Sequence, residues 1–367
     1  MHGQTLIQCR VANELSAADR AEIDRVANHA GIQGMHATTG LVNAICSGYR
    51  FDVHWITAAR NDQMLATLPL VFQKTFLFGR YLVSLPYLNW GGIAVDDSAG
   101  LENGEAAKIR ISLVDRAIEL AEQLKVKFLE LRHEQPVEHE RLSSKGANKC
   151  QMRMSIAEGT EHAFARCRST VRTQVRKGDK QEFVLDFGGA ELIEDYYRVF
   201  ATNMRDLGTP VFSKQLFIQF AEQMGDRAEL CVVKKSQQPI ACALVFHHPA
   251  CGNIGGLTEV PSASALRSAR KTAVNTWMYW QIIQRAIERG SQTFDFGRST
   301  PQESTYDFKR KWGAEPSPIG WQRFSSDESV DEVRPDNPKY SKAIETWQKL
   351  PLGLANLLGP SIVRGIP

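Results

Sequence analysis

The same order of predicted secondary-structure elements occurs twice along the chain, and this repeat restricts the folds open to it. The first half has predicted strands over 51–57 and 64–72, an apolar run over 81–92, a helix over 105–125 and a strand over 126–132. The second half has predicted strands over 228–235, 240–247 and 253–257, a helix over 272–289 and a strand over 292–297. A shift of about 165 residues overlays the two helix–strand units, with Ala121 on Ala286 and Glu130 on Asp295. The repeat therefore predicts two similar α/β domains.

The composition is that of a globular protein and excludes several functional classes. The 367 residues are 43% hydrophobic and 23% charged, which is enough for two cores, and the net charge of +3 indicates no particular partner. Seven cysteines without a CxxC pair predict reduced thiols, and no apolar run reaches the roughly 20 residues of a membrane-spanning helix. We therefore expect a soluble, cytoplasmic protein.

Motifs of other enzyme classes are missing from the sequence. It contains no GxSxG, HExxH or Walker pattern, so nothing in it indicates a hydrolase or an NTPase. His247 and His248 lack further ligands at metal-binding spacing, so the sequence predicts no metal site.

The stretch 292–313 contains the residues that are best suited to binding a ligand or taking part in a reaction. A buried strand ends in Gly297 and Arg298, a polar loop follows, and a basic, aromatic helix contains Lys309. In α/β folds, ligands collect at the carboxyl end of buried strands. Asp295 stands between two phenylalanines and must point away from their face. It is therefore a candidate for substrate contact, or a structural carboxylate paired with Arg298 or Lys309.

Five blocks spread over nearly the whole chain carry a resemblance to a known family. They are LPYLNWGG at 85–92, VRTQVRKGDK at 171–180, YRVFATNMRDLGTP at 197–210, the 294–316 segment with FDFGRST and TYDFKRKWGAEP, and 337–367. In this order they resemble the FemAB family of acyltransferases, double-GNAT proteins that add amino acids to peptidoglycan precursors. The closest similarity is to the branch associated with exosortase (PEP-CTERM) and exopolysaccharide systems. The resemblance implies an α/β fold of two tandem GNAT-like domains with mixed, twisted sheets and a helical C-terminal tail.

The resemblance also implies site residues. Lys309 matches the family's Phe-Lys pair, in which the lysine stabilises charge developing on the carbonyl during aminolysis; such a cation is worth roughly a hundred-fold or more in rate. The alternative is a solvated basic run over 309–311. Asp295 and Tyr306 are the other catalytic candidates. The candidate substrate-binding residues are Asn89, Trp90, Gly91, Gly92, Asn203, Arg205, Asn275, Arg298, Ser299, Phe308 and Trp312. For Gly91 and Gly92, a tight turn is an equally good interpretation.

Five arginines are candidates for binding donor phosphates: Arg168, Arg172, Arg176, Arg267 and Arg270. One helix predicted over 161–180 places the first three on one face, where either solvent or an anionic partner offsets their repulsion. GNAT enzymes hold the CoA pyrophosphate on a glycine-containing loop that opens the central helix. The corresponding segment, 261–271, has no glycine. The sequence thus predicts an aminoacyl-tRNA or another large anionic donor over acetyl-CoA, and no permanently bound cofactor.

The predicted function is transfer of an acyl or aminoacyl group to an amine or hydroxyl of a cell-envelope or exopolysaccharide precursor. Two alternatives are a CoA-dependent N-acetyltransferase and a catalytically inactive double-GNAT scaffold in exopolysaccharide assembly. The scaffold stays open because the family's Ser-Gly-Thr-Tyr run reads Glu303-Ser304-Thr305-Tyr306 here, without the glycine.

The predicted domains are 1–155 and 156–330, followed by a helical tail over 331–367. A helix over 16–30 begins at Ser16, with Asp19 near capping-box spacing. The tail is strongly apolar, and Pro351 and Pro360 are expected to break it into short helices. We expect it to dock on the two domains, with at most weak peripheral membrane contact.

Overall fold

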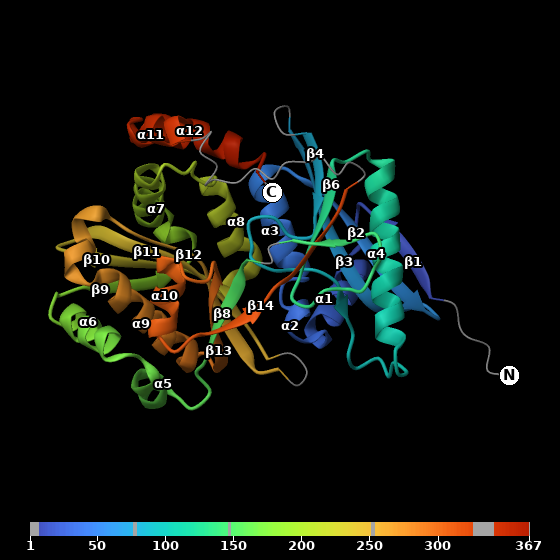
Figure 1. Ribbon diagram of the computed structural model, residues 1–367, viewed down its shortest axis with the longest axis horizontal. Helices are drawn as coiled ribbons and strands as arrows, with labels where there is room; N and C mark the ends of the chain where they lie inside the picture. Colours follow the sequence, from blue (N-terminus) through green and yellow to red (C-terminus); the bar gives the residue numbers. More distant parts are fainter. Residues whose placement is uncertain (1–6, 76–78, 146–147, 251–253, 326–340, 367) are drawn as a thin grey trace.

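The protein forms two mixed β-sheets that lie side by side and are covered by helices (Figure 1). This computed structural model describes residues 7–75, 79–145, 148–250, 254–325 and 341–366. The predicted tail boundary at 331 falls outside these ranges. The six cysteines among the described residues are all unpaired.

The first half of the chain supplies most of one sheet. Its strands are β1 (Gln8–Ala12), β2 (Asp52–Arg60), β3 (Gln63–Thr75), β4 (Gly79–Val83), β5 (Ala94–Val95), β6 (Phe128–His133) and β7 (Ser143–Ser144). Its helices are α1 (Ala17–His29), α2 (Gly31–Gly34), α3 (Thr39–Tyr49) and α4 (Glu105–Gln123). The predicted capping box at the start of α1 is confirmed, because Ser16 and Asp19 each accept the other's backbone N–H through their side chains.

The second half supplies most of the other sheet. Its strands are β9 (Val184–Gly188), β10 (Ala228–Lys235), β11 (Gln238–His248), β12 (Gly256–Ala265), β13 (Ser291–Ser299), β14 (Glu315–Pro318) and β15 (Gly320–Phe324). That sheet also contains β8 (Cys150–Ser155), which comes from the first half of the chain. The α-helices of the second half are α5 (Thr160–Arg166), α6 (Ser169–Asp179), α7 (Ile193–Leu207), α8 (Lys214–Met224), α9 (Val274–Glu288) and α10 (Ser304–Lys311), with α11 (Ser341–Gln348) and α12 (Leu352–Val363) in the tail. Short 3₁₀ helices are η1 (Ala190–Leu192), η2 (Gly225–Arg227) and η3 (Arg267–Thr272).

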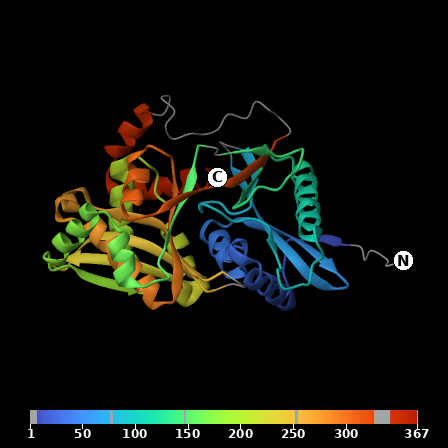
Figure 2. The ribbon, with the colours of Figure 1, turned by 60° about the horizontal axis from the view of Figure 1, so that its bottom comes forward.

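Each sheet contains a strand from the other half of the chain. The first sheet has the order β1-β2-β3-β4-β6-β15-β7, with β5 paired to β3, and the second has the order β14-β8-β13-β12-β11-β10-β9. Thus β8 lies beside β13, and the chain crosses from β14 in one sheet to β15 in the other (Figure 2). The predicted boundaries 1–155 and 156–330 are wrong for these two strands. Both strands lie outside the repeated units, so the repeat contains no signal for the exchange.

A buried carboxylate faces an arginine on each exchanged strand. In the first sheet, Glu130 of β6 stands in register with Arg323 of β15, which donates to it at 2.6 Å. In the second sheet, Asp295 of β13 stands in register with Arg153 of β8, which donates to it at 2.9 Å. Glu130 and Asp295 are 3% and 0% exposed, and they are the pair that the sequence repeat overlays. The repeat therefore extends to the side chains that hold the exchanged strands.

The two sheets share the feature that positions a site. In each, a strand that precedes the long helix runs parallel to the strand that follows the helix: β4 with β6, and β12 with β13. The β12–β13 pairing ends at Glu259 and Asp295. Beyond these residues, β12 continues to pair with β11, and β13 continues to pair with β8. The parallel strands therefore separate at their carboxyl ends, which is where ligands bind in such sheets.

The halves are also joined by packing, since one hydrophobic core contains residues from both. Helix α3 of the first half lies against α8 of the second. At their contact, a Cβ on Gly48 would come within 2.8 Å of the Leu216 Cα, so only glycine permits this approach. The interface is thus a shared core rather than a loose contact between domains.

The tail packs on the body through one of its faces. Gly359 and Val363 of α12 lie against Val211 and Tyr87, and the Arg205 guanidinium donates to the backbone carbonyl of Leu350 at 3.1 Å. The expected docking is therefore confirmed. The expected break at Pro360 is wrong, because α12 continues through this residue despite the missing N–H.

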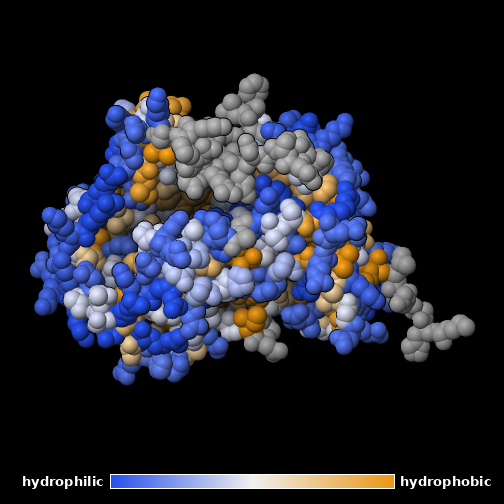
Figure 3. Space-filling view, viewed as in Figure 1, coloured by the Kyte–Doolittle hydropathy of each residue, from blue (hydrophilic) through white to orange (hydrophobic). Residues whose placement is uncertain are grey.

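The opposite face of α12 is apolar and exposed. Leu354, Leu357 and Leu358 are 42%, 72% and 43% exposed, and hydrophobic side chains gather over this region (Figure 3). None of the described helices is both long and apolar enough to span a membrane.

We expect that removal of residues 338–367 lowers the melting temperature and promotes aggregation, because it uncovers the apolar surface beneath α12. Light scattering and thermal unfolding of the truncated protein would show this. The control is Leu357→Ser, which changes only the solvent-facing side and should leave the melting temperature unchanged. A truncated protein that is equally stable and only loses liposome binding would make the tail a membrane anchor instead.

Candidate functional site

The backbone of β13 is distorted at the point where β12 and β13 separate. The register with β8 shifts between Asp295 and Arg298, and Gly297 has a φ of +77°. The Gly297 N–H donates to the Asp295 carboxylate at 2.6 Å, which fixes this bulge. A Cβ on Gly297 would lie 2.8 Å from the Asn89 side-chain nitrogen, so glycine lets the 87–92 loop of the first half approach closely.

Asp295 is a fully buried carboxylate with three donors. Besides Gly297, it accepts from the Gln151 side-chain amide at 2.6 Å and from Arg153 at 2.9 Å. Arg153 also binds Glu134. The predicted pairing of Asp295 with Arg298 or Lys309 is wrong, because the exchanged strand β8 supplies both side-chain partners. Asp295 therefore organises the site and has no surface left for substrate.

Lys309 is a buried ammonium without a carboxylate partner among the described residues. Its Nζ donates to the carbonyls of Gly297 and Arg298 at 3.1 and 2.9 Å. Its exposed fraction is 8%, whereas Arg310 and Lys311 beside it are exposed, so the alternative of a solvated run does not hold for Lys309. Burial lowers its pKa to about 8, although the charge of Asp295 opposes this. Because an ammonium has three N–H donors, one is left for a ligand.

Arg298 is a second cation without a carboxylate partner in the described part of the chain. It is half-buried, and its guanidinium lies 4.2 Å from the centre of the Trp321 ring, over which Arg132 also lies. Burial and then the charge of Arg132 lower the pKa of Arg298 to about 10. Arg132 itself donates to Glu130, which it shares with Arg323. Arg298 is thus the accessible cation of the site and the one suited to an anionic ligand.

Three buried polar atoms around Asp295 have no hydrogen-bond partner among the described residues. They are Trp90 Nε1, Gln151 Oε1 and Ser299 Oγ. Buried polar groups in folded proteins are nearly always satisfied, so such a cluster marks a place where water or a polar ligand is bound. Cations also outnumber carboxylates in this region. The cations are Arg132, Arg153, Arg298, Lys309 and Arg323, and the carboxylates are Glu130, Glu134 and Asp295.

In the 89–92 segment, Asn89 and Trp90 lie at the site, whereas Gly91 and Gly92 have structural roles. Asn89 reaches Gly297, and the Trp90 ring lies beneath Arg153 at 5.4 Å. Gly91 forms a backbone bridge to Arg132 in β6, and a Cβ on Gly92 would clash with His133. The two glycines therefore allow close packing against β6, and neither of them lies in a tight turn.

Two predicted substrate-binding residues belong to the core instead. Trp312 is fully buried, and its ring and that of Phe308 pack with each other and with Tyr279. The substrate-binding role predicted for Phe308 and Trp312 is therefore wrong. Both aromatic side chains face the hydrophobic core of the second sheet. Tyr306 is half-buried against the same core and makes no hydrogen bond to a described residue.

Other predicted residues lie elsewhere on the second half. Asn203 and Arg205 sit inside α7 rather than in a loop, where Asn203 donates to Ser264 at 3.1 Å and Arg205 holds the tail. Asn275 lies in the first turn of α9. The structure gives no contact between these residues and Lys309.

The predicted basic face at 168–176 is not continuous. The single helix expected over 161–180 is broken at Cys167 into α5 and α6, so Arg168 precedes α6. Arg172 donates to the carbonyls of Ala165 and Cys167, and Arg176 lies over the Phe164 ring. Arg172 thus satisfies the end of α5 and is not available to a phosphate group.

The segment before α9 is better suited to phosphate than its sequence suggests. Ala273 adopts a left-handed conformation, with a φ of 66°, and so takes the conformational role expected of a glycine. No side chain caps α9, so its first N–H groups receive no side-chain acceptor at Ala273. Arg270 and Lys271 are exposed beside it without an ion pair among the described residues, whereas Arg267 binds Asp206.

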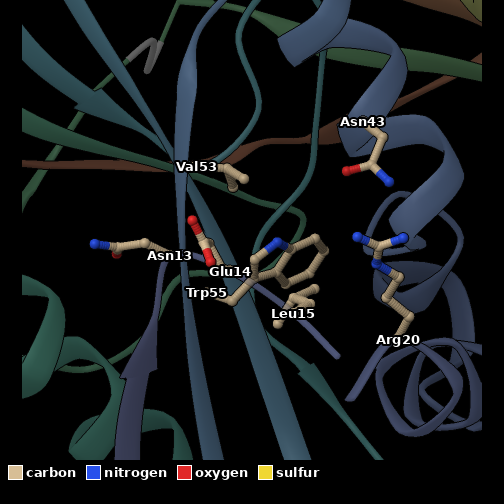
Figure 4. Close-up of a pocket in the computed structure, with 7 residues that line it drawn as sticks. All are labelled: Asn13, Glu14, Leu15, Arg20, Asn43, Val53 and Trp55. Atoms are coloured by element: carbon tan, nitrogen blue, oxygen red, sulfur yellow. The ribbon is translucent and has the colours of Figure 1, made fainter. Parts of the chain in front are cut away.

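A separate cavity of about 300 Å³ lies in the first half, between β2, α3 and the segment before α1 (Figure 4). Its lining residues are Asn13, Glu14, Leu15, Arg20, Asn43, Val53 and Trp55. None of these is a candidate site residue, and the cavity has no assigned role.

Residues 165–310 match the sequence model of a family described as an acetyltransferase (GNAT) domain. A search of the curated proteins found no match to this sequence. Among solved structures, FemX aligns with a TM-score of 0.64 at 14% identity, over 86% of this chain and 97% of that chain. The C-terminal domain of a putative lysylphosphatidylglycerol synthetase from Agrobacterium fabrum aligns with a TM-score of 0.54 at 10% identity, over 84% and 91%.

A conserved protein of unknown function from Bacteroides thetaiotaomicron also aligns, with a TM-score of 0.51 at 8% identity over 87% of this chain and 99% of that chain. These similarities cover both halves. Together with the internal repeat, they confirm the predicted fold class of two tandem GNAT-like α/β domains.

The pKa of Lys309 sets an expected pH dependence. The ammonium is charged below about pH 8 and loses its proton as the pH rises through that value. If the reaction requires the positive charge of Lys309, kcat/KM should fall above about pH 8. The Lys309→Arg variant keeps its charge at all these pH values, so any activity that it retains should lack this fall. A rise in activity through the same range, lost in Lys309→Arg, would instead make neutral Lys309 a base.

Proposed function

We propose that the protein is a transferase of the GNAT type that moves an acyl or aminoacyl group to an amine or hydroxyl. The observation that carries this proposal is Lys309, a buried cation with one free N–H at the carboxyl end of the β12–β13 pair. The acceptor attacks the donor carbonyl directly within a ternary complex. The carbonyl oxygen becomes an oxyanion, which the Lys309 ammonium stabilises. The bond to the donor's leaving group then breaks, and the leaving group takes up the proton that the acceptor loses.

Arg298 supports an anionic acceptor. A half-buried guanidinium without a carboxylate partner is suited to a carboxylate or a phosphate, which it can bind with two parallel hydrogen bonds. Precursors of the cell envelope and of exopolysaccharides carry such groups, and the FemAB resemblance supports an acceptor of this class. The exosortase-associated branch rests on that resemblance alone.

The donor that the geometry supports best is an acyl-CoA thioester. The start of α9, with Ala273 in the left-handed conformation and Arg270 and Lys271 exposed beside it, is suited to a pyrophosphate. An aminoacyl-tRNA is the second candidate, but the arginine row that favoured it in the sequence is interrupted at Arg172. The inactive scaffold remains as an alternative because of the missing glycine in Glu303–Tyr306.

The test of the proposal is transfer activity in Lys309→Met. We expect a loss of about a hundred-fold or more, because the oxyanion loses its cation, while the fold is kept. The measurement is thiol release from acetyl-CoA with a panel of amines that carry a carboxylate or a phosphate. The matched control is Lys311→Met, an exposed lysine of the same helix, which should behave as wild type. Near wild-type turnover in Lys309→Met would remove the charge-stabilising role.

A further inference from the structure

His36, His248 and Glu259 meet at the interface of the two halves. His36 lies between α2 and α3, while His248 and Glu259 lie on the paired strands β11 and β12. The Nε2 atoms of both histidines contact the same carboxylate oxygen of Glu259, that of His248 at 2.8 Å. One ligand atom from each of the three residues lies within 4.8 Å of the other two. The sequence cannot show this cluster, because His36 and Glu259 are 223 positions apart.

The charge of this cluster is unusual for a protein interior. Glu259 is 2% exposed, and among the described residues no lysine or arginine forms an ion pair with it. In the described part of the chain, the two imidazoles are the only groups that form an ion pair with its carboxylate. A buried carboxylate requires a positive partner, and neutral imidazoles supply only hydrogen bonds.

A neighbouring cluster in the same sheet shows the contrast. Glu229 binds His247, but it also pairs with Arg285 and Arg289, with N–O distances of 2.7 and 3.4 Å. There the arginines neutralise the carboxylate, and no further cation is required. The cluster at Glu259 has the same acidic and imidazole groups without the arginines.

The ligand set fits a transition metal. Two imidazole nitrogens and a carboxylate oxygen are common ligands of zinc and of iron(II), at about 2.0–2.2 Å from the ion. The ligand atoms of the three residues already lie within 4.8 Å of one another, which is close enough for side-chain adjustment to place them around one ion. The Trp90 ring, centred 3.7 Å from that of His36, holds this histidine in place.

We propose that His36, His248 and Glu259 bind one divalent transition-metal ion, which clamps the first half of the chain to the second. Zinc is the ion that we choose for the test. The ion is structural, since all three ligands are buried and Lys309 already supplies the cation proposed for catalysis. The inference does not depend on the proposed transferase activity.

The test is metal content and thermal stability of the full-length protein with its affinity tag removed. We expect about one equivalent of zinc per chain, and a melting temperature that falls after chelation and recovers when zinc is returned. Glu259→Gln and His248→Ala should lose the zinc. His247→Ala, which removes a buried histidine of the neighbouring cluster, should keep it.

A second measurement covers the case in which the variants fail to fold. Chelated wild-type protein loaded with cobalt(II) should develop the visible absorption of a nitrogen- and oxygen-ligated ion at about one equivalent. The proposal is overturned if wild-type protein binds well below about 0.1 equivalent of either metal. It is equally overturned if His247→Ala loses the metal as Glu259→Gln does.

Discussion

Two buried cross-strand pairs, Glu130 with Arg323 and Asp295 with Arg153, are the interactions on which the architecture depends. Each joins a strand of one half to a strand that comes from the other half. A buried ion pair contributes little net stability when intact, but removal of one partner leaves an uncompensated charge and costs about 3–5 kcal/mol. Such pairs therefore select the strand exchange against other pairings more than they stabilise the fold.

The same exchange assembles the candidate site. It brings Gln151 and Arg153 to Asp295, and it brings Trp321 beneath Arg298. Once the exchanged strands have satisfied the carboxylates, Lys309 and Arg298 are left without an anionic partner among the residues that the structure describes. The chemistry proposed for the site thus follows from the way the halves interlock.

Sequence patterns predicted what depends on local or repeated features. Periodicity located most strands and long helices, and the repeat overlaid Glu130 on Asp295, which occupy equivalent places in the two sheets. What it missed depends on distant contacts: β8 and β15 are short strands outside the repeat, and the partners of Asp295 come from one of them. The lack of a glycine before α9 was also misleading, because the backbone of Ala273 takes a conformation that is normally left to glycine.

The most direct test of the account is a double-mutant cycle on the free energy of unfolding, with Asp295→Asn, Arg153→Met and the double variant. We expect each single change to cost about 3–5 kcal/mol, because each leaves a buried group unpaired. The double change should cost clearly less than the sum of the two. Single variants within about 0.5 kcal/mol of wild type, with additive effects, would contradict the claim that this pair holds the exchanged strand.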